Sequence, residues 1–108
     1  MKYLCLAYGD EKDWKALSKS EQDQLLAQDE VLRERGDFVA PVGTATTVQA
    51  PNGKLITGNG PFADSKVPLA GFSLIEAGDL NEVIELVSKT PCPNAGGAVE
   101  VWPVLKVD

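Results

Sequence analysis

Histidine is absent from this 108-residue chain, and cysteine occurs only twice. Because imidazole and thiolate groups are the ordinary ligands of zinc and copper, we expect no such metal site, and we predict no cofactor. The absence of histidine also removes the side chain that most often performs acid–base catalysis near neutral pH. Cys5 and Cys92 fall on separate predicted elements. We therefore expect free thiols, with Cys5 buried and inert in a strand and Cys92 more exposed in a loop.

Basic residues are also scarce, since 10 Lys and Arg face 16 Asp and Glu, which gives a net charge of −6. The basic residues are scattered, whereas phosphate binding needs them clustered, so a nucleic-acid binder is excluded. No apolar run approaches the roughly 20 residues that a membrane span requires. We expect a cytoplasmic chain that forms one domain over residues 1–108 and binds neither nucleic acid nor membrane.

The predicted elements follow the order strand, helix, strand with a hairpin, strand, helix, strand. Their ranges are strand 2–8, loop 9–17, helix 21–35, strand 38–42, extended 44–49, turn 51–54, returning strand 54–57, strand 69–77, helix from about 80 to 90, and strand 98–105. Ser20 and Asp79 are the expected helix N-caps. A helix after the first strand and another before the last indicate split βαβ units. The predicted fold is therefore ferredoxin-like α+β, with an antiparallel sheet covered by two helices on one face.

The first strand is apolar on both of its faces. One face carries Leu4, Leu6 and Tyr8, and the other carries Tyr3, Cys5 and Ala7. Two helices cover only one face of such a sheet, so the other face needs a second cover. We therefore predict a homodimer that packs sheet to sheet.

The Gly- and Pro-rich segment 59–66 is the first candidate for a ligand-binding loop. Its glycine lets the backbone approach a ligand closely, and its phenylalanine offers a ring for stacking. Trp102 on the last strand is a second stacking surface. The candidate ligand-binding residues are Asn59, Gly60, Pro61, Phe62, Lys66 and Trp102. The alternatives are a rigid turn whose phenylalanine packs in the dimer seam, and a tryptophan in the core.

Candidate catalytic groups in a chain without histidine are carboxylates and phenols. We select Asp10, Asp64 and Tyr8, with a turn-forming role as the alternative for Asp10. Glu76 and Glu100 lie on predicted strands and would need a partner such as Lys2, Lys54 or Arg33 if a dimer buried them. We interpret the acidic residues of the first helix as a solvated face: Glu21, Asp23, Asp29, Glu30 and Glu34.

Two stretches of the sequence resemble the YCII-related domain family, in its DGPF branch. The central stretch runs from Thr47 through Gly53-Lys54-Leu55-Ile56-Thr57-Gly58-Asn59-Gly60-Pro61-Phe62-Ala63-Asp64-Ser65-Lys66 to Gly71-Phe72, and the closing stretch is Val99-Glu100-Val101-Trp102-Pro103. The resemblance implies a ferredoxin-like fold and a dimeric α/β barrel. It also implies that some relatives carry a catalytic His–Asp pair. At least one type of relative removes HCl from a chlorinated aromatic diol, and some relatives occur beside sigma-factor-like regulators.

The chain departs from this family pattern at functional positions. Asn59 stands where the branch has its signature Asp, and Trp102 stands where the closing motif usually has Arg. The family His and Asp would fall near Leu25 and Thr90, neither of which performs acid–base chemistry. The His–Asp mechanism is therefore not carried over to this chain.

Three functions remain open at this stage. The first is a dimeric protein that binds a small molecule in a cleft at the dimer seam. The second is a histidine-independent lyase- or hydrolase-like enzyme acting on a small substrate, an aromatic one included. The third is a regulatory or protein-interaction module.

Overall fold

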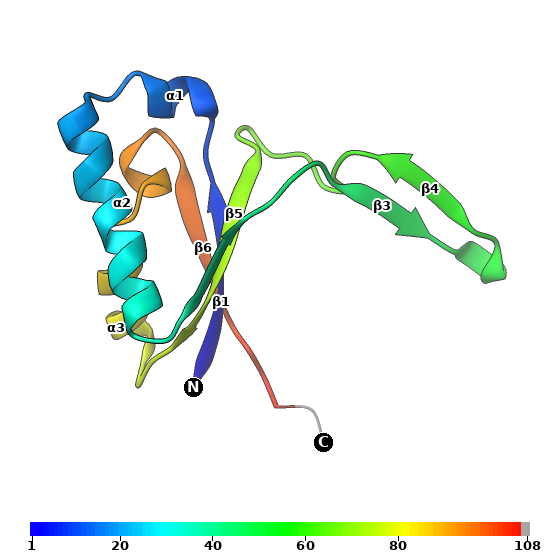
Figure 1. The fold of residues 1–108 in the computed structure, drawn as a ribbon. Helices are drawn as coiled ribbons and strands as arrows, with labels where there is room; N and C mark the ends of the chain where they lie inside the picture. The colour runs from blue at the N-terminus through cyan, green and yellow to red at the C-terminus, as the bar shows by residue number, and fades with distance from the viewer. Residues whose placement is uncertain (107–108) are drawn as a thin grey trace.

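The computed structural model describes residues 1–106, which form two layers and a projecting hairpin (Figure 1). The strands are β1 (Lys2–Tyr8), β2 (Phe38–Pro41), β3 (Thr46–Gln49), β4 (Ile56–Asn59), β5 (Leu69–Glu76) and β6 (Ala98–Pro103). The helices are α1 (Glu11–Lys15), α2 (Lys19–Glu34) and α3 (Leu80–Val87), with short 3-10 turns at Pro51–Gly53 and Cys92–Asn94.

The main sheet is antiparallel and has the strand order β2-β5-β1-β6. Strands β1 and β2 run parallel with β5 between them, and α2 connects them. Strands β5 and β6 run parallel with β1 between them, and α3 connects them. These are two split βαβ units, so the predicted ferredoxin-like α+β fold is confirmed. Figure 1 shows both connecting helices on one side of the sheet.

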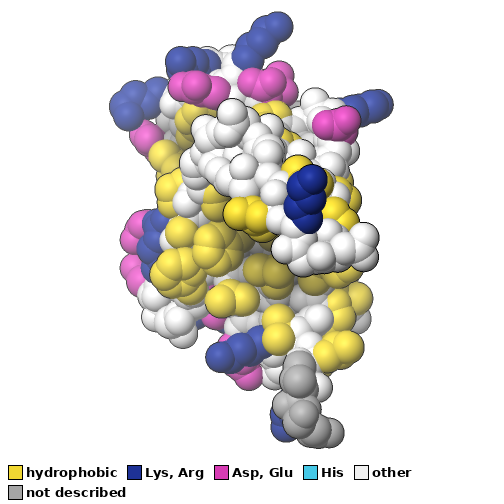
Figure 2. Space-filling view, turned by 90° about the vertical axis from the view of Figure 1, so that its right-hand side faces the viewer, with side chains coloured by type: hydrophobic (Ala, Val, Ile, Leu, Met, Phe, Trp, Pro, Cys, Tyr) yellow, Lys and Arg dark blue, Asp and Glu magenta, His cyan; other side chains and the backbone are white. Residues whose placement is uncertain are grey.

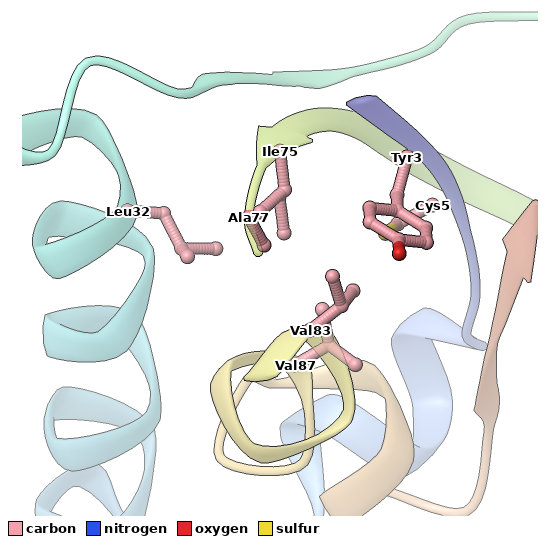
Figure 3. Close-up of a cluster of buried hydrophobic side chains, with 7 residues drawn as sticks. All are labelled: Tyr3, Cys5, Leu32, Ile75, Ala77, Val83 and Val87. Carbon is pink, nitrogen blue, oxygen red and sulfur yellow. The ribbon is translucent and has the colours of Figure 1, made fainter. Parts of the chain in front are cut away.

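The core lies between the sheet and these two helices (Figure 3). Odd-numbered residues of β1 and β5 point into it because side chains alternate across a strand. Its buried members are Tyr3, Cys5, Leu32, Ile75, Ala77, Val83 and Val87. Helix α3, predicted from about residue 80 to 90, buries Val83 and Val87, which lie four positions apart on one helix face.

Among residues 1–106 no helix lies over the other face of the main sheet, and we call it the open face. It carries the even-numbered residues of β1, paired across strands as Leu4 with Leu74 and Leu6 with Phe72. Figure 2 looks onto the side from which the hairpin projects, where hydrophobic side chains gather beside and below that hairpin. The predicted two-sided apolar sheet is therefore present. Phe38, at 56% exposure, and Leu74, at 39%, show how much of this apolar face meets solvent in one chain.

Strands β3 and β4 form a separate two-stranded sheet, which we call the arm (residues 45–60). Asn52 has φ 54° and Gly53 has φ 77°, and these two left-handed residues lie in the turn predicted at residues 51–54. Hydrogen bonds close the base of the arm, where the Gly60 N–H donates to the Ala45 carbonyl at 2.9 Å. In Figure 1 the arm points away from the sheet on the side opposite the helices.

Several local predictions were wrong. The last strand ends at Pro103 and not at residue 105, and α3 ends at Val87 and not near residue 90. The segment predicted as a loop contains α1, because the Asp10 side chain caps it by accepting from the Lys12 N–H at 3.0 Å. The long helix begins two residues earlier than predicted. Its N-cap is Ser18, which forms a reciprocal capping box with Glu21, whereas Ser20 lies inside the helix. The strand returning from the turn spans Ile56–Asn59 and not residues 54–57.

Candidate functional site

A cleft of about 620 Å³ lies on the open face where β1 and β6 meet the segment that follows the arm. Strand β1 contributes Leu6 and Tyr8, and β6 contributes Glu100 and Trp102. The side chains on each strand lie two residues apart, so they share the open face. Residues 63–67 form the remaining wall and add the carboxylate of Asp64 and the ammonium group of Lys66.

Hydrogen bonds from two aromatic side chains converge on one carboxylate oxygen in this cleft. The Tyr8 hydroxyl donates to Oε1 of Glu100 at 3.1 Å, and the Trp102 indole N–H donates to the same atom at 3.3 Å. Partial burial raises the pKa of Tyr8, and the hydrogen bond to Glu100 and its negative charge raise it further. Tyr8 therefore stays a neutral donor, which holds the Glu100 carboxylate in a fixed orientation within the cleft.

A close backbone approach shapes one end of the cleft. A Cβ atom built on Gly97 would lie 1.9 Å from the carbonyl oxygen of Tyr8 and 3.0 Å from that of Cys92. No side chain fits there, so glycine is required on steric grounds. Gly97 thereby lets the loop before β6 lie directly against the end of β1.

The structure brings four of the predicted site residues together in the open-face cleft. These are Tyr8, Asp64, Lys66 and Trp102. Trp102 is 54% exposed, so the alternative of a core tryptophan is wrong for the single chain. A basic partner was expected for Glu100 only if a dimer buried it, and within the single chain its partners are the phenol and the indole.

The other predicted ligand-binding residues lie at the base of the arm, apart from this cleft. Asn59 ends β4, and Gly60, with φ 99°, accepts a hydrogen bond from the Thr47 hydroxyl at 2.7 Å. Pro61 and Phe62 line a groove with strand β3, and the Phe62 side chain is 78% exposed. The loop predicted as one unit is thus divided, with residues 59–62 at the base of the arm and residues 63–67 in the cleft.

Two other predicted carboxylates also lie elsewhere. Asp10 caps α1 and borders a groove of about 500 Å³ with Trp14 and Cys92. Glu76 is exposed, and it pairs with the N-terminal ammonium of Met1 at 2.9 Å rather than with a lysine or arginine side chain. That pairing lowers the pKa of Glu76.

A second cavity, of about 280 Å³, lies on the helix side of the sheet. It is lined by Cys5, Asp29, Thr90 and Cys92, among mainly apolar neighbours. The expectation that Asp29 belongs to a solvated helix face was wrong, because the residue is half-buried and burial raises the pKa of its carboxyl group. Burial likewise raises the pKa of both thiols, which keeps them protonated and poorly nucleophilic.

The position of Asp29 was readable from the sequence. The residue follows Leu25 by four positions and precedes Leu32 by three, and both leucines belong to the stripe that α2 turns toward the sheet. Positions at these intervals share one helix face. Thr90, where the resemblance places the family Asp, lines the same cavity.

The fold and the open apolar face together define a ferredoxin-like α+β protein of the kind that leaves one side of its sheet free. The chain belongs to the YCII-related domain family, whose model matches residues 1–108. An uncharacterized protein from Rhizobium meliloti (strain 1021) is 30% identical over 114 residues, covering 96% of this chain and 92% of that protein.

A solved structure shares the fold. It is 5-chloro-2-hydroxyhydroquinone dehydrochlorinase from Burkholderia phenoliruptrix AC1100 in complex with 2,5-dihydroxybenzoquinone, with a TM-score of 0.51 and 20% sequence identity. The match covers 97% of this chain and 94% of that one. At this identity the likeness concerns the fold. Among residues 1–106, no helix has the length and apolar character to cross a membrane.

Proposed function

We propose that this chain is a homodimeric protein that binds a small hydroxylated aromatic molecule in the open-face cleft, between the two sheets of the dimer. The observation that carries the proposal is the convergence of Tyr8 and Trp102 on Glu100 inside a cleft of about 620 Å³ with an apolar floor. Such a volume lies within the range of ordinary small-molecule sites, which are mainly apolar with a few placed polar groups.

The chemistry of the cleft favours a flat ligand with hydroxyl groups. The indole of Trp102 and the side chain of Leu6 supply apolar contact for a ring. The carboxylates of Asp64 and Glu100 accept hydrogen bonds from ligand hydroxyls, and Lys66 donates to a ligand oxygen. With two carboxylates against one ammonium, the cleft disfavours a ligand that carries several negative charges.

A homodimer follows from the same face. Leu4, Leu6, Phe72 and Leu74 lie in register on adjacent strands of the open face, which no helix among residues 1–106 covers. A second copy of the chain, packed at the usual sheet spacing of about 10 Å, would exclude water from these side chains. It would also cover the open-face cleft of each chain. This arrangement is the dimeric barrel that the family resemblance implies.

A thermal-shift experiment tests ligand binding, because a molecule that binds the native state raises the melting temperature by mass action. The first probes are 2,5-dihydroxybenzoquinone, the ligand bound to the dehydrochlorinase of similar fold, together with hydroquinone and simple phenols. We expect a concentration-dependent rise that Trp102→Ala abolishes and Ile84→Ala, on the far side of the molecule, leaves intact. If no probe raises the melting temperature, or if Trp102→Ala responds like the wild type, the proposed cleft is wrong.

A histidine-independent enzyme is the second candidate, and Asp29 is the observation that favours it. A general acid or base needs a titratable group that faces a cavity and has a pKa shifted toward neutral pH. The Asp29 carboxyl group has a raised pKa and lines a cavity of about 280 Å³. Turnover of a chlorinated hydroquinone, measured as chloride release, tests this function. Activity lost in Asp29→Asn but kept in Asp23→Asn, at an exposed position of the same helix, would support it.

A further inference from the structure

The arm projects from the main sheet as a separate hairpin. In the part of the chain that the structure describes, β3 and β4 pair with each other and with no other strand. A lone two-stranded hairpin is marginally stable in water. Its apolar side chains are nevertheless open to solvent, with exposures of 63% for Val48, 68% for Leu55 and 47% for Ile56. The arm therefore presents the surface of an element that packs against something outside the chain.

The direction of the arm limits what can lie against it. Figure 1 shows it extending from the side of the sheet that carries the open face, opposite the helices. The radius of gyration of 15.7 Å exceeds the roughly 13 Å expected of a compact domain of this length. Two packed sheets lie about 10 Å apart, and a strand rises about 3.3 Å per residue, so the arm is long enough to pass alongside a twin seated on the open face.

The exposed apolar area matches what a dimer of this size needs. Phe38, Phe62 and Trp102 are 56%, 78% and 54% exposed. At about 200 Å² per aromatic side chain, these fractions leave about 375 Å² in water, nearly half of the roughly 800 Å² per partner in a standard interface. The aliphatic residues of the arm and of the open face add to this area.

Charge also favours a second copy of this chain as the partner. From Gly43 to Phe62 the only charged residue is Lys54, near the tip of the arm. Since the whole chain carries −6, the residues outside this segment carry −7. A cationic tip projecting from one chain is therefore attracted to the acidic body of another.

We propose that the arm of each chain packs along the side of a second copy of the chain. Its apolar side chains lie against that copy, and Lys54 lies near carboxylates of that copy. This inference rests on the proposed homodimer and adds the element that holds it together. A pair of reciprocal arms is a closed, two-fold symmetric arrangement, because each chain gives and receives the same contact.

Sedimentation velocity at micromolar concentration tests the arm with two matched substitutions. Ile56 on the arm and Ile84 on α3 are 47% and 49% exposed, so Asp at either position places the same charge on a comparable surface. We expect Ile56→Asp to weaken dimerisation at least tenfold and Ile84→Asp to leave it unchanged, with both variants showing wild-type circular dichroism. Equal dimerisation of the two variants would overturn the role of the arm while leaving the sheet-to-sheet dimer standing. A wild-type monomer would overturn both proposals and would assign the arm to a different partner.

Chemical crosslinking locates the arm independently of affinity. A carbodiimide couples lysine to carboxylate, and a mixture of ¹⁵N-labelled and unlabelled chains distinguishes links between chains from links within one. We expect mixed-isotope peptides that join Lys54 to an acidic residue of the other chain. Lys54→Arg keeps the charge but removes the reactive amine, so these peptides should vanish in that variant. Links from Lys54 confined to its own chain would show that the arm folds back and would overturn the inference.

Discussion

The hydroxyl of Tyr8 on β1 donates a hydrogen bond to Oε1 of Glu100 on β6 at 3.1 Å, across two adjacent strands and within the open-face cleft. The pair crosses the strand junction diagonally, since Tyr8 is in register with Ala98. It fixes the one carboxylate that also accepts from the Trp102 indole. This hydrogen bond requires the protonated form of the Tyr8 phenol, so the geometry of the site favours the neutral side chain.

This pair predicts how the protein responds to alkaline pH. Burial, followed by the hydrogen bond and charge of Glu100, raises the pKa of Tyr8 above its ordinary value of 10.0. A group whose pKa is raised on folding contributes stability below its unfolded pKa, and the contribution disappears as pH rises through the folded pKa. We expect Glu100→Gln to lower the pKa of Tyr8, seen as earlier phenolate absorbance in a spectrophotometric titration. A titration curve identical to that of the wild type would show that Glu100 does not act on Tyr8.

Asp29 is predicted to destabilise the folded protein at neutral pH, where its carboxyl group is charged. Burial raises the pKa of its carboxyl group above the ordinary 3.8, against the lowering effect of the nearby Arg33 charge. Its folding contribution is therefore largest below that ordinary value and is lost as pH rises through the folded pKa. At pH 7 the buried charge opposes folding, so Asp29→Asn should raise the melting temperature by about one to a few degrees. The gain should shrink near pH 3, and a gain of the same size at pH 3 and pH 7 would contradict the role of the buried charge.

The start of α2 offers a comparison between two serines of one helix. Ser18 accepts a hydrogen bond from the Glu21 N–H at 3.1 Å, and the Glu21 carboxylate accepts from the Ser18 N–H at 3.1 Å. Ser18→Ala should lower the free energy of unfolding by about 1 kcal/mol because it removes this cap. Ser20→Ala lies within the helix and should be neutral or slightly stabilising, since alanine has the higher helix propensity. Chemical denaturation of both variants measures the difference, and equal effects would remove the assigned cap.

Gly97 predicts a steric effect on the cleft. Its Cβ in Gly97→Ala would overlap the Tyr8 carbonyl oxygen at 1.9 Å, so the loop before β6 has to move. We expect a loss of about 2 kcal/mol or more in unfolding free energy, together with weaker probe binding. Gly43→Ala is the matched control, because a Cβ there meets no atom within 4 Å. Calorimetry on the two variants checks the first effect, and the thermal-shift assay checks the second.

Local signals were sufficient to predict much of the fold. The i, i+3, i+4 and i+7 spacing of apolar residues located α3, and Asn52-Gly53 located the turn of the arm. The start of α2 was harder, because Ser18 and Ser20 both precede an acidic residue by three positions. Only the reciprocal hydrogen bonds with Glu21 distinguish them. Each of these features depends on residues close together in the chain.

The candidate site depends on contacts that sequence spacing does not specify. Residues 63–67 lie against β6, more than 30 positions later, and no local pattern predicts that approach. The division of the predicted loop between the arm and the cleft likewise depends on the direction of the whole hairpin. Asp29 is different, because the helical period already placed it beside Leu25 and Leu32.

The location of Trp102 makes it an intrinsic fluorescence probe of the open-face cleft. The chain has two tryptophans, and Trp14 lies on α1, away from the open face. In a Trp14→Phe background, all remaining indole emission would come from the open-face cleft. The wavelength of maximum emission would report whether water reaches Trp102, without any attached dye. It could be followed as the protein is diluted or as a probe is added.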